Sequence, residues 1–280
     1  MKAARMTENA PAPTPDVDTI VFIHGLWMTP LSWEHWIERF TGYGFNVLAP
    51  AWPKVEGTPE EIRNDPSRIA NVGIAEILDS YETVIKGLDK PPIIIGHSFG
   101  GGFTEILLDR GLGAAGVAIS PASARGIFAL PFSTLKSGFS ILKNPLNKSK
   151  GVAFGPSQFH YAFCNTLTEA ESQKYYDRYA IPGVGRVLFE GAMANANPKT
   201  AFRLDWANND RAPLLVTGAT EDHVVPAKVA KTNAHKYHKS SAVTEYKEYA
   251  GRSHFTAGMD GWEATADEAL TWAIANAKKV

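Results

Sequence analysis

Cysteine is almost absent from this sequence of 280 residues. The single residue, Cys164, excludes an internal disulfide and a metal site built from several cysteines, so the chain is compatible with a reducing compartment. Charge of one sign is not in excess either, because 28 basic and 29 acidic residues leave a formal net charge of −1. We therefore expect a small molecule as partner, and neither nucleic acid nor a membrane.

Long apolar runs are also missing. The chain has no stretch of 18 consecutive apolar residues, and its first residues contain no apolar segment of signal-peptide length. These absences predict a cytoplasmic protein. Residues 1–18, with three prolines between Pro11 and Pro15, are expected to form a flexible leader.

The chain does contain short, continuous apolar runs, which are typical of parallel strands covered on both faces. They alternate with segments of helical periodicity, and this alternation predicts an α/β fold with a mostly parallel central sheet and helices on both faces. The expected strands are 19–23, 45–49, 93–95, 116–119, 213–217 and a half-exposed 243–249; the expected helices are 30–40, 69–88, 99–110, 224–239 and 262–278.

Residues 121–207 break this alternation. They are rich in aromatic side chains, and only 169–179 and 185–194 show clear helical spacing. Because the segment lies between two strands of the sheet, and loops at the carboxyl ends of strands carry function, we expect a largely helical cap over the site. The core would then consist of residues 19–120 and 208–280.

The apolar run 93–95 leads directly into a G-x-S-x-G motif, residues 96–100. Between a strand and a helix, this motif forms a sharp turn that holds a serine oxygen at the carboxyl edge of the sheet. Ser98 is therefore the expected nucleophile, and the flanking glycines leave room where a Cβ would collide with neighbouring chain. A nucleotide-binding loop is not indicated, since neither G-x-G-x-x-G nor G-x-x-x-x-G-K-[ST] occurs.

A serine hydroxyl needs an adjacent base, which is itself oriented by a third group. His254 follows the expected strand 243–249, and Asp222 follows the strand 213–217, so both would lie at the same edge of the sheet as Ser98. Glu221 is an alternative acid. Capping of the next helix is the purely structural alternative for Asp222.

Acyl chemistry also requires donors for the oxyanion that forms when serine adds to a carbonyl. The backbone N–H of Phe99 is one candidate, and the loop after strand 19–23 supplies the other, from Leu26 or alternatively Trp27. The side chain of Trp27 is expected to contact substrate. His160 in the cap is a second candidate for substrate contact, with packing as its alternative role.

Four motifs occur in a characteristic order: His24-Gly25, residues 96–101, Asp222 to Pro226, and Gly251 to Phe255. In this order they resemble the α/β-hydrolase family, in particular serine esterases and lipases with a cap insertion. The resemblance implies the α/β-hydrolase fold, a Ser98, Asp222 and His254 triad, and no cofactor or metal. It also implies a carboxylesterase that cleaves a small apolar ester through an acyl-serine.

Other activities stay open at this stage. Members of the family use the same triad on lactones, thioesters or carbon–carbon bonds, or as perhydrolases. Members with halide or epoxide chemistry carry Asp where this chain has Ser98, so those activities are not expected. A ligand-binding or signalling protein with a vestigial site is the alternative from another class. A homo-oligomer is also left open.

Overall fold

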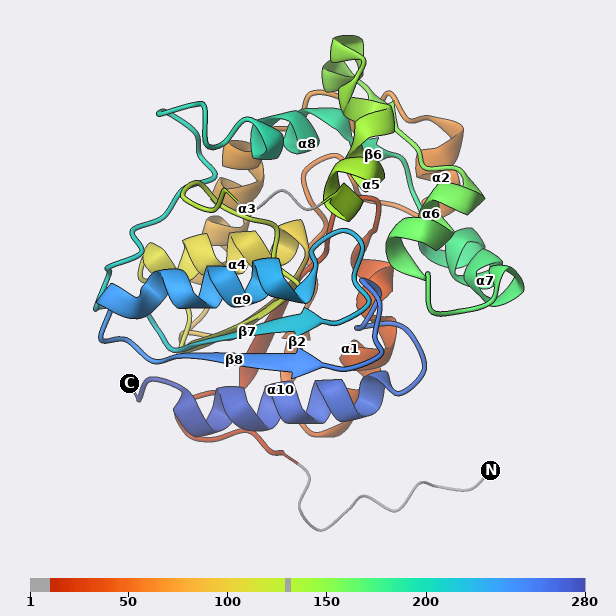
Figure 1. Cartoon of the computed structure of the whole chain (residues 1–280). Coiled ribbons are helices and arrows are strands. Elements are labelled where there is room, and N and C mark those ends of the chain that lie inside the picture. Colours follow the sequence, from red (N-terminus) through yellow and green to blue (C-terminus); the bar gives the residue numbers. More distant parts are fainter. Residues whose placement is uncertain (1–10, 129–131, 280) are drawn as a thin grey trace, which may run out of the picture.

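The computed structural model describes residues 11–128 and 132–279 (Figure 1). Its centre is a six-stranded sheet with the order β2-β1-β3-β4-β7-β8, and every neighbouring pair of strands is parallel. The predicted fold class is thus confirmed. The strands are β1 (Thr19–Ile23), β2 (Asn46–Leu48), β3 (Ile93–His97), β4 (Ala115–Ile119), β7 (Leu214–Ala219) and β8 (Thr244–Tyr249).

Helices cover both faces of this sheet, as Figure 1 shows. Alternate residues of β1 separate the two hydrophobic layers: Val21 and Ile23 belong to one buried cluster, and Ile20 and Phe22 to the other. Because both faces are buried, the strand sequences are continuously apolar. The first layer contains α3 (Ile74–Lys86), α4 (Phe99–Asp109) and α9 (Ala227–Lys236), and the second contains α1 (Glu34–Gly42) and α10 (Trp262–Asn276).

The strand order reverses next to β1. The chain runs from β1 to the edge strand β2 and then returns to β3 on the other side of β1. The loops that follow β1 and β3 therefore leave the sheet side by side, and ligands of open α/β sheets bind at such a switch point.

Residues 121–207, the predicted cap, leave the sheet after β4 and return to it at β7. This segment is tied to the loop after β1 by two hydrogen bonds: Trp27 Nε1 donates to the carbonyl of Val152 (3.0 Å), and the amide of Ile181 donates to the carbonyl of Trp27 (3.0 Å). Its elements are α5 (Phe132–Leu142), a 3-10 turn (Pro145–Ser149), β5 (Gly151–Val152), α6 (Pro156–Phe163), α7 (Glu169–Tyr179), β6 (Gly183–Val184) and α8 (Gly185–Ala192).

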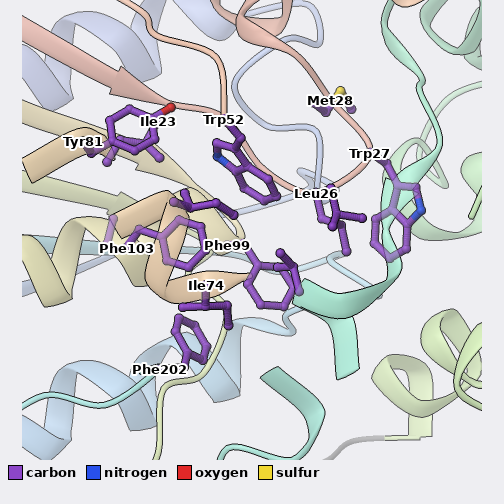
Figure 2. Close-up of a cluster of buried hydrophobic side chains, with 14 of the residues drawn as sticks. Ile23, Leu26, Trp27, Met28, Trp52, Ile74, Tyr81, Phe99, Phe103 and Phe202 are labelled. Atoms are coloured by element: carbon purple, nitrogen blue, oxygen red, sulfur yellow. The ribbon is translucent and has the colours of Figure 1, made fainter. Parts of the chain in front are cut away.

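Aromatic packing joins the cap to the core (Figure 2). The ring of Phe103 on α4 lies 5.5 Å from Trp52, which follows β2, and 5.8 Å from Phe202 of the cap. Phe202 also lies 5.6 Å from Phe99. The first residue after the G-x-S motif is thus packed between core and cap.

Several predicted boundaries were wrong. The helix expected from residue 69 begins at Ile74, because Asn71 adopts a left-handed conformation (φ +64°) and Gly73 precedes the first turn. The expected loop up to residue 66 contains α2 (Pro59–Asn64), which a capping box between Thr58 and Glu61 stabilises. In the cap, α5 and α6 were not predicted.

The expected leader falls partly outside the described residues, which begin at residue 11. Of the part that is described, Val17 is only 1% exposed and belongs to the hydrophobic layer beneath α1. The amide of Asn46 donates to the carbonyl of Asp18 (2.9 Å) and extends the pairing of β1 with β2. Packing against the core therefore starts before Thr19.

Candidate active site

Ser98 occupies the turn between β3 and α4 in a strained conformation, with φ +57° and ψ −120°. The two flanking glycines make this turn feasible. A Cβ on Gly96 would lie 2.0 Å from the carbonyl oxygen of Gly100, and a Cβ on Gly100 would lie 2.1 Å from that of Ile23. Any larger residue would displace backbone, so the steric role predicted for the glycines is supported.

Asp222 and His254 form a buried pair at the carboxyl ends of β7 and β8. Asp222 Oδ2 accepts a hydrogen bond of 2.7 Å from His254 Nδ1, and both side chains are completely buried. Asp222 Oδ1 accepts two further bonds, from the amides of Val224 (2.8 Å) and Val225 (2.7 Å). Because the carboxylate can only accept, Nδ1 carries the proton and Nε2 presents its lone pair.

The alternative acid, Glu221, does not contact this histidine in the structure. Its carboxylate accepts a hydrogen bond from the hydroxyl of Thr220 (3.0 Å), and its side chain is exposed. Asp222 makes contacts of both kinds that the sequence left open, those of a cap and those of an acid beside a histidine. One oxygen accepts amide hydrogen bonds in the loop before α9, and the other holds the imidazole of His254.

His97 supports His254, a role that the sequence analysis missed. His97 Nε2 donates to the carbonyl of His254 (2.8 Å), and the two ring centroids are 4.6 Å apart. Burial, reinforced by the neighbouring imidazole, holds the pKa of His97 well below its usual value, so the ring stays neutral. On another side, the ring of Phe163 from the cap lies 5.0 Å from that of His254 and shields it from solvent.

His254 Nε2 is buried and has no hydrogen-bond partner within the described chain. In particular, no bond joins it to Ser98 Oγ there, although Ser98 directly follows His97, which contacts the His254 ring. Catalytic hydrogen bonds are often long before substrate binds. The unpartnered lone pair is therefore available to a donor in the site.

The loop after β1 runs against the serine. A Cβ on Gly25 would lie 3.0 Å from Ser98 Cβ, so a side chain there would push the loop away. His24 holds the loop by donating from Nδ1 to the carbonyl of Gly25 (3.0 Å) and accepting at Nε2 from the amide of Trp52 (3.2 Å). Burial lowers the pKa of His24 to about 4, so this histidine is a neutral structural residue.

The backbone amides of Leu26, Trp27 and Phe99 donate no hydrogen bond to other described residues. These are the two predicted oxyanion donors and the alternative. Trp27 has φ +67°, and its ring stacks on Phe154 of the cap at 4.1 Å. The side chain of Trp27 faces the cavity described next, whereas Leu26 is buried in the core.

A cavity of about 180 Å³ opens from Ser98 between core and cap. For scale, an engineered apolar cavity of about 150 Å³ binds benzene. Its walls are mostly apolar and include Trp27, Phe99, Leu142, Phe154, Leu188, Phe202, Val224 and Val229. His160 is not among the residues that line this cavity, and its contact with substrate stays a prediction.

Helix α5 forms part of the cavity roof and is tied to the loop that carries Asp222. Thr134 Oγ1 donates to the carbonyl of Val224 (2.8 Å), and Ser137 Oγ donates to that of His223 (3.2 Å). The polar groups of this wall are therefore satisfied by protein, and the wall offers mainly apolar contacts to a ligand.

Among the described residues, none of the helices combines the length and the apolar composition needed to cross a bilayer. Nor do residues 11–128 and 132–279 bring together three or more His, Cys, Asp or Glu side chains as a set of metal ligands.

A parallel sheet with a strained serine after β3, and a buried Asp-His pair after its last two strands, defines an α/β-hydrolase architecture. The chain belongs to the alpha/beta hydrolase family, whose family model matches residues 20–268. No curated protein sequence matches the chain.

Solved structures resemble the chain over nearly its whole length. An extracellular α/β-hydrolase from a Paenibacillus species is 20% identical, with a TM-score of 0.65 over 91% of this chain and 98% of that one. A monoacylglycerol lipase from Paleococcus ferrophilus is 20% identical, with a TM-score of 0.62 over 95% and 97%. A pyrethroid hydrolase from Sphingobium faniae is 17% identical, with a TM-score of 0.62 over 92% and 98%. These likenesses concern the fold.

Proposed function

We propose that the protein is a serine hydrolase that cleaves the carboxylic ester of a small apolar substrate through an acyl-serine. The observation that carries the proposal is the buried hydrogen bond of 2.7 Å between Asp222 and His254, beside a serine in the strained turn of a nucleophile elbow. That bond leaves His254 Nε2 ready to accept a proton.

In the proposed reaction, Ser98 Oγ adds to the ester carbonyl while its proton passes to His254 Nε2. The carbonyl oxygen becomes an oxyanion that accepts hydrogen bonds from the amides of Phe99 and Leu26. The alkoxide then leaves with the proton from His254, and an acyl-serine remains. Water, deprotonated by His254, attacks the acyl group and restores Ser98.

The cavity supports a small and apolar acyl or alcohol group. Its volume of about 180 Å³ suits a group of roughly the size of a benzene ring or a short alkyl chain. Aromatic and aliphatic walls favour such groups through removal of apolar surface from water. The pyrethroid hydrolase and the monoacylglycerol lipase of the same fold are named for ester substrates, which adds an analogy.

The test is hydrolysis of p-nitrophenyl esters by the wild type and by Ser98→Ala. Loss of a triad nucleophile is expected to lower kcat by about 10⁶-fold. A fluorophosphonate probe should label the wild type and leave the variant unlabelled. Wild-type turnover by the variant would refute the proposal. A wild type that neither hydrolyses esters nor reacts with the probe would favour a binding protein with a vestigial site.

A further inference from the structure

The net charge of −1 conceals an uneven distribution within the cap. Its first part, residues 121–168, contains five basic side chains and no aspartate or glutamate. Its second part, residues 169–207, contains five acidic and five basic side chains. The first part is therefore a locally cationic segment in a nearly neutral protein.

Exposed apolar side chains are concentrated in the same region. Among the described residues, four of the five large hydrophobic side chains that stand out as exposed belong to the cap: Phe128 (77% exposed), Leu146 (68%), Phe139 (62%) and Met193 (55%). Three of these four lie in the acid-free part. Isolated apolar side chains on a surface are ordinary, but a group interleaved with lysines needs an explanation.

Helix α5 presents two different faces. Gly138 and Leu142, together with Thr134, line the cavity. Lys136 and Phe139, three residues apart, are exposed on the opposite side, and Lys143 continues this outer face one turn further. In Figure 1, the end of α5 and the segment after it project away from the central sheet.

The lysines of this outer surface are not neutralised by the protein. Lys136, Lys143, Lys148 and Lys150 are all exposed, and none forms an ion pair within the described chain. Lys136 has an aromatic partner, since its ammonium lies 4.0 Å above the ring of Tyr161. The surface therefore combines uncompensated positive charge with exposed Phe and Leu side chains.

We propose that this surface, defined by Phe139, Lys143, Leu146 and Lys148, docks the cap on an anionic lipid interface. Lysine is depleted in interfaces between proteins. In contrast, segments that lie in a membrane interface carry Lys or Arg beside Phe and Leu. The Phe and Leu side chains are buried at the boundary between lipid headgroups and acyl chains. Each lysine near an anionic surface contributes roughly 1 kcal/mol to binding. The charge and the side-chain types of this surface thus favour anionic lipid, rather than a second protein, as its partner.

Docking at this surface would place the cavity roof against the lipid, because α5 belongs to both. Small apolar esters that dissolve in lipid would then enter the cavity from a concentrated source. This delivery rests on the proposed esterase function, whereas the docking itself does not.

The test is co-sedimentation of the intact protein with vesicles of equal parts phosphatidylglycerol and phosphatidylcholine, and with vesicles of phosphatidylcholine alone. We expect binding to the anionic vesicles only, weakening as salt rises from about 0.1 M to 1 M and the screening length falls from about 10 Å to 3 Å. The double variant Lys143→Gln/Lys148→Gln should bind about 30-fold more weakly. Phe139→Ser should bind at least tenfold more weakly.

The matched control is Lys228→Gln/Lys231→Gln, which removes the same charge from exposed positions on α9. This control should bind like the wild type, and every variant should hydrolyse p-nitrophenyl acetate in solution at an unchanged rate. Equal loss in control and cap variants, or no binding by the wild type to anionic vesicles, would overturn the proposal. So would self-association in sedimentation velocity that Phe139→Ser abolishes, because the surface would then join two copies of the chain.

Loss of esterase activity in Ser98→Ala tests the reaction separately from docking. If that variant is inactive but binds vesicles like the wild type, both proposals stand. If the wild type binds vesicles yet cleaves no ester, docking stands and the proposed function fails.

Discussion

The core forms the floor of the cavity and the cap forms its roof, and the two glycines beside Ser98 differ from Gly138 of the roof in the space around them. In the floor, a Cβ on Gly96 or Gly100 would lie about 2 Å from backbone oxygen atoms. In the roof, a Cβ on Gly138 of α5 would meet only the side chain of Leu142, at 3.6 Å. The backbone around Ser98 therefore tolerates no added atom, whereas α5 has room for one at Gly138.

The polar contacts of the two regions differ in the same sense. Asp222 in the floor accepts three hydrogen bonds of 2.7–2.8 Å, which fix both of its oxygens. The roof helix is attached by hydroxyl groups of Thr134 and Ser137 to carbonyls of the loop beside Asp222. Changes in the floor should thus impair chemistry or folding, and changes in the roof should alter which substrate is accepted.

After the loss of Ser98 itself, the largest effect is expected at the carboxylate of the floor. Asp222→Asn should lower kcat for a p-nitrophenyl ester by about 10⁴-fold, because an amide cannot hold the imidazole in the same tautomer. Glu221→Gln is the matched control and should retain nearly full activity. If Glu221→Gln proved the more damaging change, Asp222 would not be the residue that orients His254.

The next difference between the two regions is expected in the free energy of unfolding of glycine variants. Gly96→Ala should lower the free energy of unfolding by more than about 4 kcal/mol or prevent folding, because its Cβ would overlap the backbone of Gly100. Gly138→Ala should instead raise it by up to about 1 kcal/mol, since alanine favours the helical state. Urea denaturation of both variants measures the difference. Similar losses in the two proteins would contradict this distinction between floor and roof.

A larger side chain in the roof should narrow the range of substrates. Gly138→Leu is expected to lower kcat/KM for p-nitrophenyl hexanoate relative to the acetate by about 10- to 100-fold, as loss of room for a few methylenes does. Gly42→Leu is the control, because a Cβ on Gly42 at the end of α1 has no neighbour within 4 Å and lies outside the cavity. An unchanged ratio in Gly138→Leu would show that acyl chains do not enter beneath α5.

A further effect concerns an ionisable group of the core outside the site. Burial raises the pKa of Glu105 on α4 to about 8, and its Oε2 accepts a bond of 3.2 Å from Asn233 Nδ2. The folded protein therefore keeps a proton that the unfolded chain releases near its ordinary value of 4.5. Stability from this proton is complete below that value and is lost as the pH rises to about 8.

The slope should reach at most about 1.4 kcal/mol per pH unit in this window. Glu105→Gln should show a flatter dependence and should be the more stable protein above pH 8. Urea midpoints of both proteins at a series of pH values measure it. Parallel curves for the two would mean that Glu105 is ionised in the folded state.

The sheet was predictable from the sequence because its strands are buried on both faces. The runs at 19–23, 93–95 and 213–217 are continuously apolar, and each was found within a few residues of its observed bounds. The proximity of Asp222 and His254 could then be inferred, since each follows a strand end at the same edge. This reasoning needs only strand order and polarity.

The cap was less predictable because one helix can border both the cavity and solvent. In α5, Leu142 points to the cavity while Phe139 is exposed, so its apolar residues form no single stripe. The role of His97 depends on the carbonyl of His254, 157 residues further along the chain, and no local pattern announces that contact. Loop geometry alone decides it.

The two faces of α5 also allow two properties of the protein to evolve separately. Since neighbouring positions of α5 point about 100° apart, a substitution on its inner side can change the choice of acyl group and leave the outer side intact. The reverse holds for Phe139. Proteins that evolve from this chain can therefore change their substrate selectivity and their lipid binding independently.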